Sequence, residues 1–229
     1  MKTYSRYLIA AFALLWMVGC SQSGNQPIKV ASRDAMKEEG YLEKNIEKLE
    51  KSNACQTCDF TYVVLSNKKF PKADLQGVNF NGADLRNMDL REAKFNHSFF
   101  VITEDCPHEP ASLAGSNLMQ AQLQSVDLEE VDLTDTNLSK ADLANSNVRV
   151  ALLSNSNLSN ANLQGVDFYK SDMQDANLKG ANLEGANLKK ALLMGADLEG
   201  AILKGANLSG ARWIDGSICA KGSIGKCIN

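Results

Sequence analysis

Six cysteines and two histidines are the residues of this chain with the most distinctive chemistry. Cys55 and Cys58 form a C-x-x-C pair, and Cys106 and His108 form a C-x-H pair. In an exported protein such cysteines usually form disulfides, so we expect Cys55 and Cys58 to be joined and Cys106 to be a free or exchanging thiol. A zinc site made of all four residues is the alternative, and the tight C-x-H spacing disfavours it.

Catalytic signatures are missing from the sequence. It contains no G-x-S-x-G, G-x-x-x-x-G-K-[ST], H-E-x-x-H or G-x-G-x-x-G motif. The formal net charge of −3 is too small to indicate a nucleic-acid-binding surface. We therefore expect a protein that is not an enzyme, has no cofactor or resident metal, and does not bind nucleic acid.

The first twenty residues have the pattern of a bacterial export signal. Lys2 and Arg6 precede an apolar run over 7–18, which is too short to span a bilayer. Gly19 and Cys20 end this run and resemble the lipobox of bacterial lipoproteins, in which the signal is cut before a cysteine that receives acyl chains such as palmitate. Because Ser21 follows, the resemblance implies sorting to the outer membrane, with the mature protein facing the periplasm.

Most of the remaining chain follows a five-residue period. Nine apolar centres run in steps of five from Phe60 to Phe100, and twenty-two more run from Leu113 to Ile218. In the second block the residue two before each centre is Ala, Ser, Val, Thr or Gly. The centre and this small residue are both expected to point inward.

A period of five excludes unbroken helices and strands. Five residues advance an α-helix by about 500°, so the centres would drift around it. Along a strand, positions five apart face opposite sides, whereas positions two apart share a side. The chain must therefore turn once in every five residues, and four such segments close a coil of twenty.

The pattern A-(D/N)-L-x-x, as in residues 176–190, resembles the pentapeptide repeat family. The resemblance implies an all-β fold, a right-handed quadrilateral parallel β-helix, with residues twenty apart stacked on each other. Phe60, Phe80 and Phe100 are then expected to form one buried column. The segment 213–227 is similar to the C-terminal end of exported members, which implies a Cys219–Cys227 disulfide.

The ends and the break between the blocks also have recognisable patterns. Met36, Leu42, Ile46 and Leu49 form an apolar stripe typical of a short helix that caps the first coil. Residues 103–110 interrupt the period by eight and predict a protruding loop, our first choice for a partner contact through Cys106 and His108.

Four apolar residues occupy outward positions of one side, at multiples of twenty. They predict an exposed apolar stripe for a partner or a second copy, interrupted by Asp172 and Gln174. The stripe comprises Leu152, Leu192, Met194 and Ile214.

We therefore expect a lipid-anchored outer-membrane protein that serves as a scaffold for an unknown envelope protein and that can form homo-oligomers. A DNA mimic acting on a topoisomerase is one alternative, although the outward charges are mixed in sign. A thiol- or metal-binding protein is the other.

The expected organisation is a signal peptide at 1–19, a leash at 20–31, a capping helix at 32–54, repeat blocks at 55–102 and 111–218 separated by the loop 103–110, and a C-terminal cap at 219–229.

Overall fold

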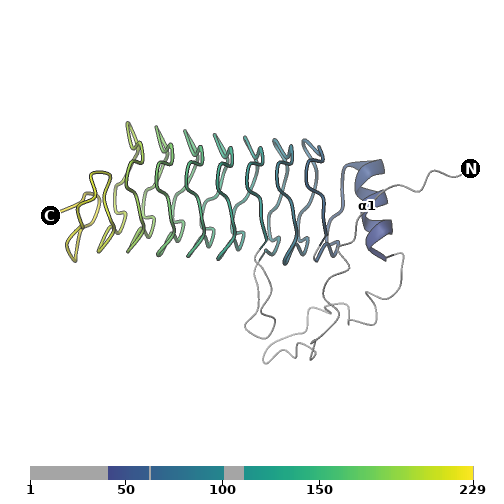
Figure 1. Cartoon of the computed structure of the whole chain (residues 1–229), viewed down its shortest axis with the longest axis horizontal. Helices are drawn as coiled ribbons and strands as arrows, with labels where there is room; N and C mark the ends of the chain where they lie inside the picture. The colour runs from purple at the N-terminus through teal and green to yellow at the C-terminus, as the bar shows by residue number, and fades with distance from the viewer. Residues whose placement is uncertain (1–40, 62, 101–110, 229) are drawn as a thin grey trace, which may run out of the picture.

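The computed structural model describes residues 41–61, 63–100 and 111–228, which build a tower of stacked coils (Figure 1). The helix α1, Tyr41–Ser52, precedes the coils and is the only helix among these described residues. The β-structure consists of isolated bridges of one residue each. The predicted solenoid of coils is confirmed, and its β-structure is limited to single bridges.

Parallel bridges join residues that lie twenty apart. The residue before each centre pairs with its counterpart in the next coil, as in the series Asp132, Leu152, Asp172 and Leu192. Five residues to a side and twenty to a coil give four sides, each with its own series of bridges. Backbone hydrogen bonds reinforce every step, for example from the Leu128 N–H to the Asn147 carbonyl at 2.7 Å.

A tight turn at every corner explains why the repeat is five residues long. The Ala83 N–H donates to the Phe80 carbonyl at 2.9 Å, and Gly82 between them has a φ of 63°. Only glycine and, at some cost, residues such as asparagine adopt this left-handed conformation readily. The frequent Gly and Asn at this position therefore form the corners.

The interior is filled by the centres and the small residues before them. Leu113, Leu153 and Leu183 have at most 1% of their surface exposed, and the alanines between the sides are buried with them. The predicted aromatic column is confirmed: the ring centroids of Phe60 and Phe80 are 5.7 Å apart, and those of Phe80 and Phe100 are 5.1 Å apart. Stacked rings of this kind add to the stabilisation from burial.

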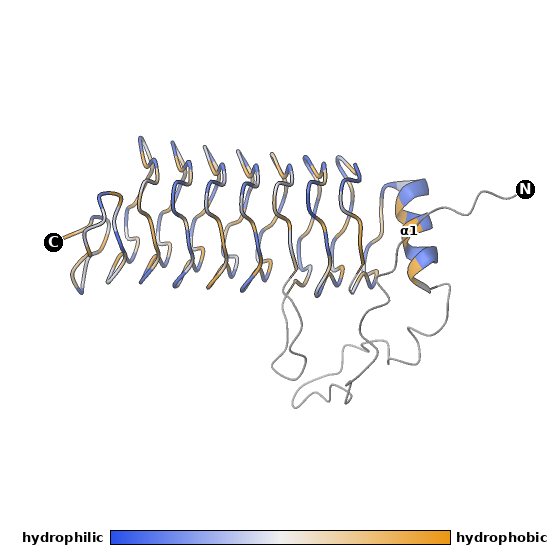
Figure 2. Cartoon of the chain, in the orientation of Figure 1, coloured by the Kyte–Doolittle hydropathy of each residue, from blue (hydrophilic) through white to orange (hydrophobic). Residues whose placement is uncertain are grey.

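α1 covers the first coil. Leu49 is buried in the core, and Ile46 and Leu42, one and two helical turns earlier, pack against the same core. Figure 2 shows this hydrophobic side of α1 toward the coils and a hydrophilic side away from them. The helix ends where Asn53, with a φ of 52°, donates its N–H to the Leu49 carbonyl. Met36 and the rest of 32–40 lie outside the described residues.

The tower begins one unit earlier than the sequence suggested. Cys55 occupies a centre position: it is fully buried, and its N–H donates to the Asp74 carbonyl at 2.8 Å. The neighbouring Ala54 forms the first parallel bridge, with Asp74. A cysteine fills the place of the usual leucine, which is why the apolar pattern did not include this unit.

The C-terminal end departs from the expected repeat at Ile218. Ile218 was expected to be an inward centre, but 60% of its surface is exposed. The Trp213 N–H donates to the Ser217 carbonyl at 2.7 Å, and Ile218 pairs antiparallel with Arg212. The chain therefore reverses after Trp213 and folds back over the last coil, so the parallel repeat ends five residues before the expected boundary.

The register survives the break between the two blocks. Asp84, Asp89, Lys94 and Phe99 bridge residues 28 positions ahead, after which the spacing returns to twenty. One coil therefore holds eight extra residues between Phe100 and Ala111. The expected loop 103–110 accounts for this number, and its residues, including Cys106 and His108, lie outside the described part of the chain.

Candidate functional site

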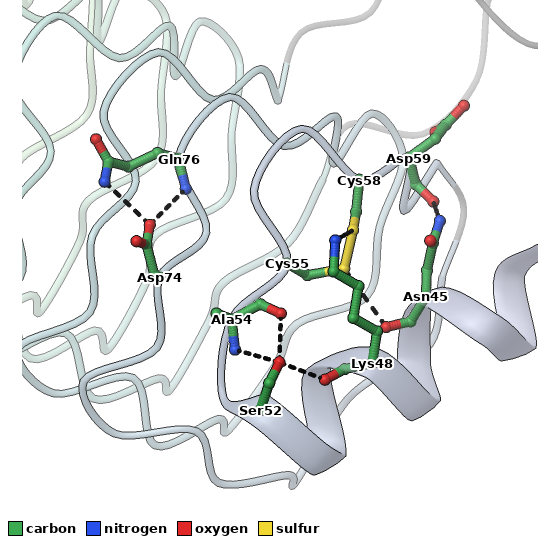
Figure 3. Close-up of a disulfide and its surroundings, with 9 residues drawn as sticks. All are labelled: Asn45, Lys48, Ser52, Ala54, Cys55, Cys58, Asp59, Asp74 and Gln76. Atoms are coloured by element: carbon green, nitrogen blue, oxygen red, sulfur yellow. Dashed lines mark hydrogen bonds between the residues drawn. A yellow bond between two sulfur atoms is a disulfide. The ribbon is translucent and has the colours of Figure 1, made fainter.

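Cys55 and Cys58 form a disulfide at the first corner of the tower (Figure 3). Cys55 is a centre and Cys58 is the small residue of the next side, so both side chains point inward across one turn. The Cys58 N–H donates to the Cys55 carbonyl, and the two Cα atoms are 5.5 Å apart. The five-residue geometry thus places a C-x-x-C pair at disulfide distance.

α1 packs directly against this disulfide. The Lys48 Nζ is 4.0 Å from the Cys58 Sγ, and the Cys55 Sγ is 3.5 Å from the Asn45 carbonyl oxygen. The Asn45 side-chain amide also donates to the Asp59 carbonyl at 3.1 Å. Figure 3 shows these contacts side by side, with the helix held over the bridge. The disulfide therefore helps to attach the N-terminal cap.

The Cys55–Cys58 disulfide argues against the zinc site that was the alternative interpretation of these cysteines. Cys55 and Cys58 have no free thiolates to offer a metal while they are bonded to each other. Within 41–61, 63–100 and 111–228 there is no group of three or more His, Cys, Asp or Glu side chains placed to hold a metal ion. Cys106 and His108, the other two residues of that alternative, lie outside these ranges.

A second disulfide, Cys219–Cys227, closes the C-terminal cap. The Cα atoms of this pair are 4.9 Å apart, and Cys219 is buried. The Cys219 N–H donates to the Ala211 carbonyl, and the Cys219 carbonyl accepts from Gly210. The bridge therefore fastens the reversed segment to the last coil.

The expected apolar stripe is discontinuous. Leu152 and Leu192 belong to one bridge series, and Asp172 stands between them. Arg212 follows Leu192 in the same series. Of the four stripe residues, Leu152 and Ile214 are exposed to 46% and 40%, whereas Leu192 and Met194 are half-buried. The structure thus places the four residues on one side: Leu192, Met194 and Ile214 lie in adjacent coils, and Asp172 separates them from Leu152.

Several charges on the outer surface are paired between or within coils. Lys72 pairs with Glu92, Lys179 with Glu199, and Lys204 with Glu184, each twenty residues apart. Within single sides, the Arg86 guanidinium donates two hydrogen bonds of 2.8 Å to Asp84 and lowers the pKa of that carboxyl group. This pairing leaves mixed signs along the sides, where a DNA mimic would need a long acidic column.

Asp127 is the exception among the aspartates of the coils. Burial, followed by the nearby Glu129 carboxylate, raises the pKa of Asp127 above its ordinary value. The Asn147 amide donates to its Oδ1 at 2.9 Å and offsets only part of this effect. Asp127 is therefore a carboxylate that is costly to ionise in the folded protein.

The register of the repeat places Arg149, Lys170, Lys189 and Lys190 on one face of mixed charge, but the sequence analysis did not predict that cations gather around Tyr169. The Arg149 guanidinium carbon is 4.8 Å from the ring centroid of Tyr169, and the ammonium nitrogens of Lys170 and Lys190 are 5.4 and 6.0 Å from it. The spacing of these residues already indicates the cluster: Tyr169 lies twenty residues after Arg149 and next to Lys170, and Lys190 lies twenty residues after Lys170. The cluster becomes visible only when successive coils are aligned.

None of the helices formed by the described residues is long and apolar enough to cross a membrane. Cys20, the expected lipidation site, lies outside those residues.

Comparison with known proteins gives the same repeat architecture. The family model of pentapeptide repeats matches eight copies, over residues 58–98, 111–139, 136–175 and 171–210. Among solved structures, QnrB1, a plasmid-mediated fluoroquinolone resistance protein, is 20% identical over 63% of this chain and 66% of its own, with a TM-score of 0.46. Rfr23 from the cyanobacterium Cyanothece 51142 is 24% identical over 72% and 94% of the two chains, with a TM-score of 0.33.

A pentapeptide repeat protein of the Arabidopsis thaliana thylakoid lumen is 30% identical over 44% of this chain and 66% of its own, with a TM-score of 0.34. No curated protein sequence matches the chain significantly. The repeat model covers most of both blocks, and its period agrees with the coils described above. The chain belongs to the pentapeptide repeat family.

Proposed function

We propose that this protein is a non-enzymatic binding scaffold of the bacterial envelope. In this proposal acyl chains on Cys20 attach it to the outer membrane, and the tower faces the periplasm. The observation that carries the scaffold function is the packed interior: from Leu65 to Leu193 the centres are almost fully buried, with Phe70 the most exposed at 6%. A tower filled by its own side chains offers its outer surface for recognition.

The two disulfides support the envelope location. Cys55–Cys58 and Cys219–Cys227 close the two ends of the tower. Structural disulfides persist in oxidising compartments such as the periplasm and are rare in the cytosol. The export pattern at 1–20 and these disulfides therefore point to the same compartment.

The anchor is tested by substituting the acylated residue. Wild-type and Cys20→Ala forms are expressed in the native bacterium, labelled with palmitate and fractionated. The wild type is expected to carry label and to sediment with outer membranes, whereas Cys20→Ala carries none. Unlabelled wild-type protein recovered from the cytoplasm contradicts the proposal.

The partner contact is tested at Leu152, which is exposed on the side with the apolar stripe. A photo-crosslinking residue is placed at 152 and, as a control, at Gln164 on another side. A discrete adduct from position 152 alone, lost in Leu192→Asp, is expected. Asp already stands at 132 and 172 of this bridge series, so the substitution suits the fold. Equal adducts at both positions, or adducts that Leu192→Asp leaves unchanged, contradict the assignment of this side.

A further inference from the structure

One side of the tower carries five residues that we name the cationic patch: Arg149, Tyr169, Lys170, Lys189 and Lys190. They follow the centres Val148, Phe168 and Leu188, so they stand on three successive coils of the same side. Arg149, Lys170 and Lys190 place their charged groups within 4.8, 5.4 and 6.0 Å of the Tyr169 ring centroid. Three positive groups therefore surround one half-buried aromatic ring.

The cationic patch places positive groups beside each other on adjacent coils. By contrast, Lys72 at a corner faces Glu92 twenty residues away, and Lys204 faces Glu184. Lys170 instead faces Lys190, and neither of them, nor Lys189, has a carboxylate within 4.0 Å among the residues that the structure describes. Like charges on adjacent coils repel each other, and the contacts of the two ammonium groups with the Tyr169 ring offset part of this repulsion.

Lys170 and Lys190 stand at corners, with φ values of 60° and 61°. Other corners also carry non-glycine residues in this left-handed conformation, Lys72 and Lys140 among them. The conformation is therefore a property of the repeat, and it places the two lysines at equivalent positions of adjacent coils.

Arg149 is held in place beside these lysines. Its Nε is 3.5 Å from the Glu129 carboxylate in the coil before, and its Nη1 is 3.2 Å from Asp167 in the coil after. These two contacts orient the guanidinium over the Tyr169 ring. The guanidinium of Arg149 is therefore held in one orientation, whereas the ammonium groups of Lys170 and Lys190 have no ion pair with any described residue and can turn toward a ligand.

We propose that the cationic patch binds a phosphoryl group. Lysine ammonium groups are point-charge donors suited to phosphate oxygens, and a phosphoryl group has enough oxygens to be shared by two of them. Lys170 and Lys190 stand on adjacent coils, about 5 Å apart by the usual spacing of paired strands, so one phosphoryl group can bridge them. The ring of Tyr169 supplies the floor of the site.

The test compares the double variant Lys170→Asn/Lys190→Asn with the control Lys140→Asn. Lys140 stands at a corner of another side with a φ of 59°, so the control removes one lysine charge from the same conformation, where the double variant removes two. Asparagine already occupies such corners at 145, 155 and 160, which keeps the fold intact. Full-length protein in non-ionic detergent is titrated calorimetrically with inorganic tripolyphosphate. Phosphatidylcholine vesicles with and without phosphatidic acid are tested by flotation, using the Cys20→Ala form of each protein.

We expect the double variant to lose at least about tenfold in affinity and the control to change less than about twofold. Loss with tripolyphosphate identifies a soluble phosphorylated ligand, and loss only with phosphatidic acid vesicles identifies a lipid headgroup; both support the phosphoryl site. Equal losses in the double variant and the control show a diffuse charge effect and overturn the proposal. Absence of binding to both probes overturns it as well.

Discussion

At the scale of single residues, four of the five positions of a repeat each have one physical task. The centre and the small residue fill the interior, the residue before the centre forms the bridge, and the last residue makes the corner. Asp127 shows the conflict that arises when a charge stands at the bridge position: it is half-buried, and Glu129 lies two residues further along the same side.

Asp127→Asn is expected to stabilise the protein at pH 7 by less than about 1 kcal/mol. Because burial and Glu129 raise the pKa of Asp127, the folded protein binds this proton more tightly than the unfolded chain. The stability from protonation is therefore complete below the unfolded value of about 3.9 and is lost as the pH rises through the raised folded pKa. Asparagine imitates the protonated form and keeps the acceptor for Asn147.

Thermal unfolding followed by circular dichroism at pH 7 and pH 3 measures this effect. The gain should be present at pH 7 and disappear at pH 3. Asp142→Asn is the matched control: Asp142 also accepts from an asparagine twenty residues later, at 2.9 Å, but has Ala144 where Asp127 has Glu129. A larger gain in the control than in Asp127→Asn would contradict the assignment.

At the scale of elements, each inner coil is covered by its neighbours, whereas the two end coils need separate covering structures. The first coil is covered by α1 and the last by a reversed segment, and each has one disulfide. Solenoids depend on such ends because an uncovered coil exposes both its apolar centres and its backbone groups.

Leu49→Ala is expected to lower the free energy of unfolding by about 2–5 kcal/mol, because it leaves a cavity between α1 and the first coil. Leu49 is the buried residue of the helix, with 1% of its surface exposed. Urea unfolding under oxidising conditions measures the loss. Glu47→Ala, on the exposed face of α1, should change stability by less than about 0.5 kcal/mol. Similar values for both variants would show that α1 does not cap the tower.

At the scale of the whole molecule, the period of five was sufficient to predict the coils, the buried faces and the aromatic column. The same pattern misplaced both ends. The pattern of apolar centres did not include Cys55, because a cysteine fills the place of the usual leucine. It did include Ile218, which has the right spacing, but the chain has already turned back at Gly216, where φ is 86°. Spacing records which residues can point inward, but hydrogen bonds decide where a coil stops.

The cationic patch shows the same limit for functional residues. Tyr169, Lys170, Lys189 and Lys190 are separated along the chain by an ordinary stretch of repeat, and each is unremarkable by itself. Their meaning depends on which charges stand beside them in adjacent coils, and so on the three-dimensional register. The stripe at Leu152 was predicted from the register together with its interruption at Asp172, and the bridges place Asp172 between Leu152 and Leu192.

Replacing residues 101–110 by Asn-Gly is expected to preserve the fold and to change the melting temperature by only a few degrees. The replacement restores twenty residues between Asp84 and its partner Ser112, which now bridge across 28. Shortening a loop lowers its closure entropy by roughly 0.6 kcal/mol for each halving of its length. Circular dichroism and thermal melting check the outcome, and an unfolded or aggregated product would show that the extra residues hold the two blocks together.

The unbroken register across that eight-residue excursion has a broader consequence. Each bridge fixes its own pair of neighbours, so a change in the length of one corner does not propagate to the coils above or below. The stacked coils and an inserted surface segment are therefore independent of each other: the bridges between coils stay the same while a single corner lengthens and acquires new side chains. Selection, or a protein engineer, can graft a binding segment onto any of the four edges and leave the shaft untouched.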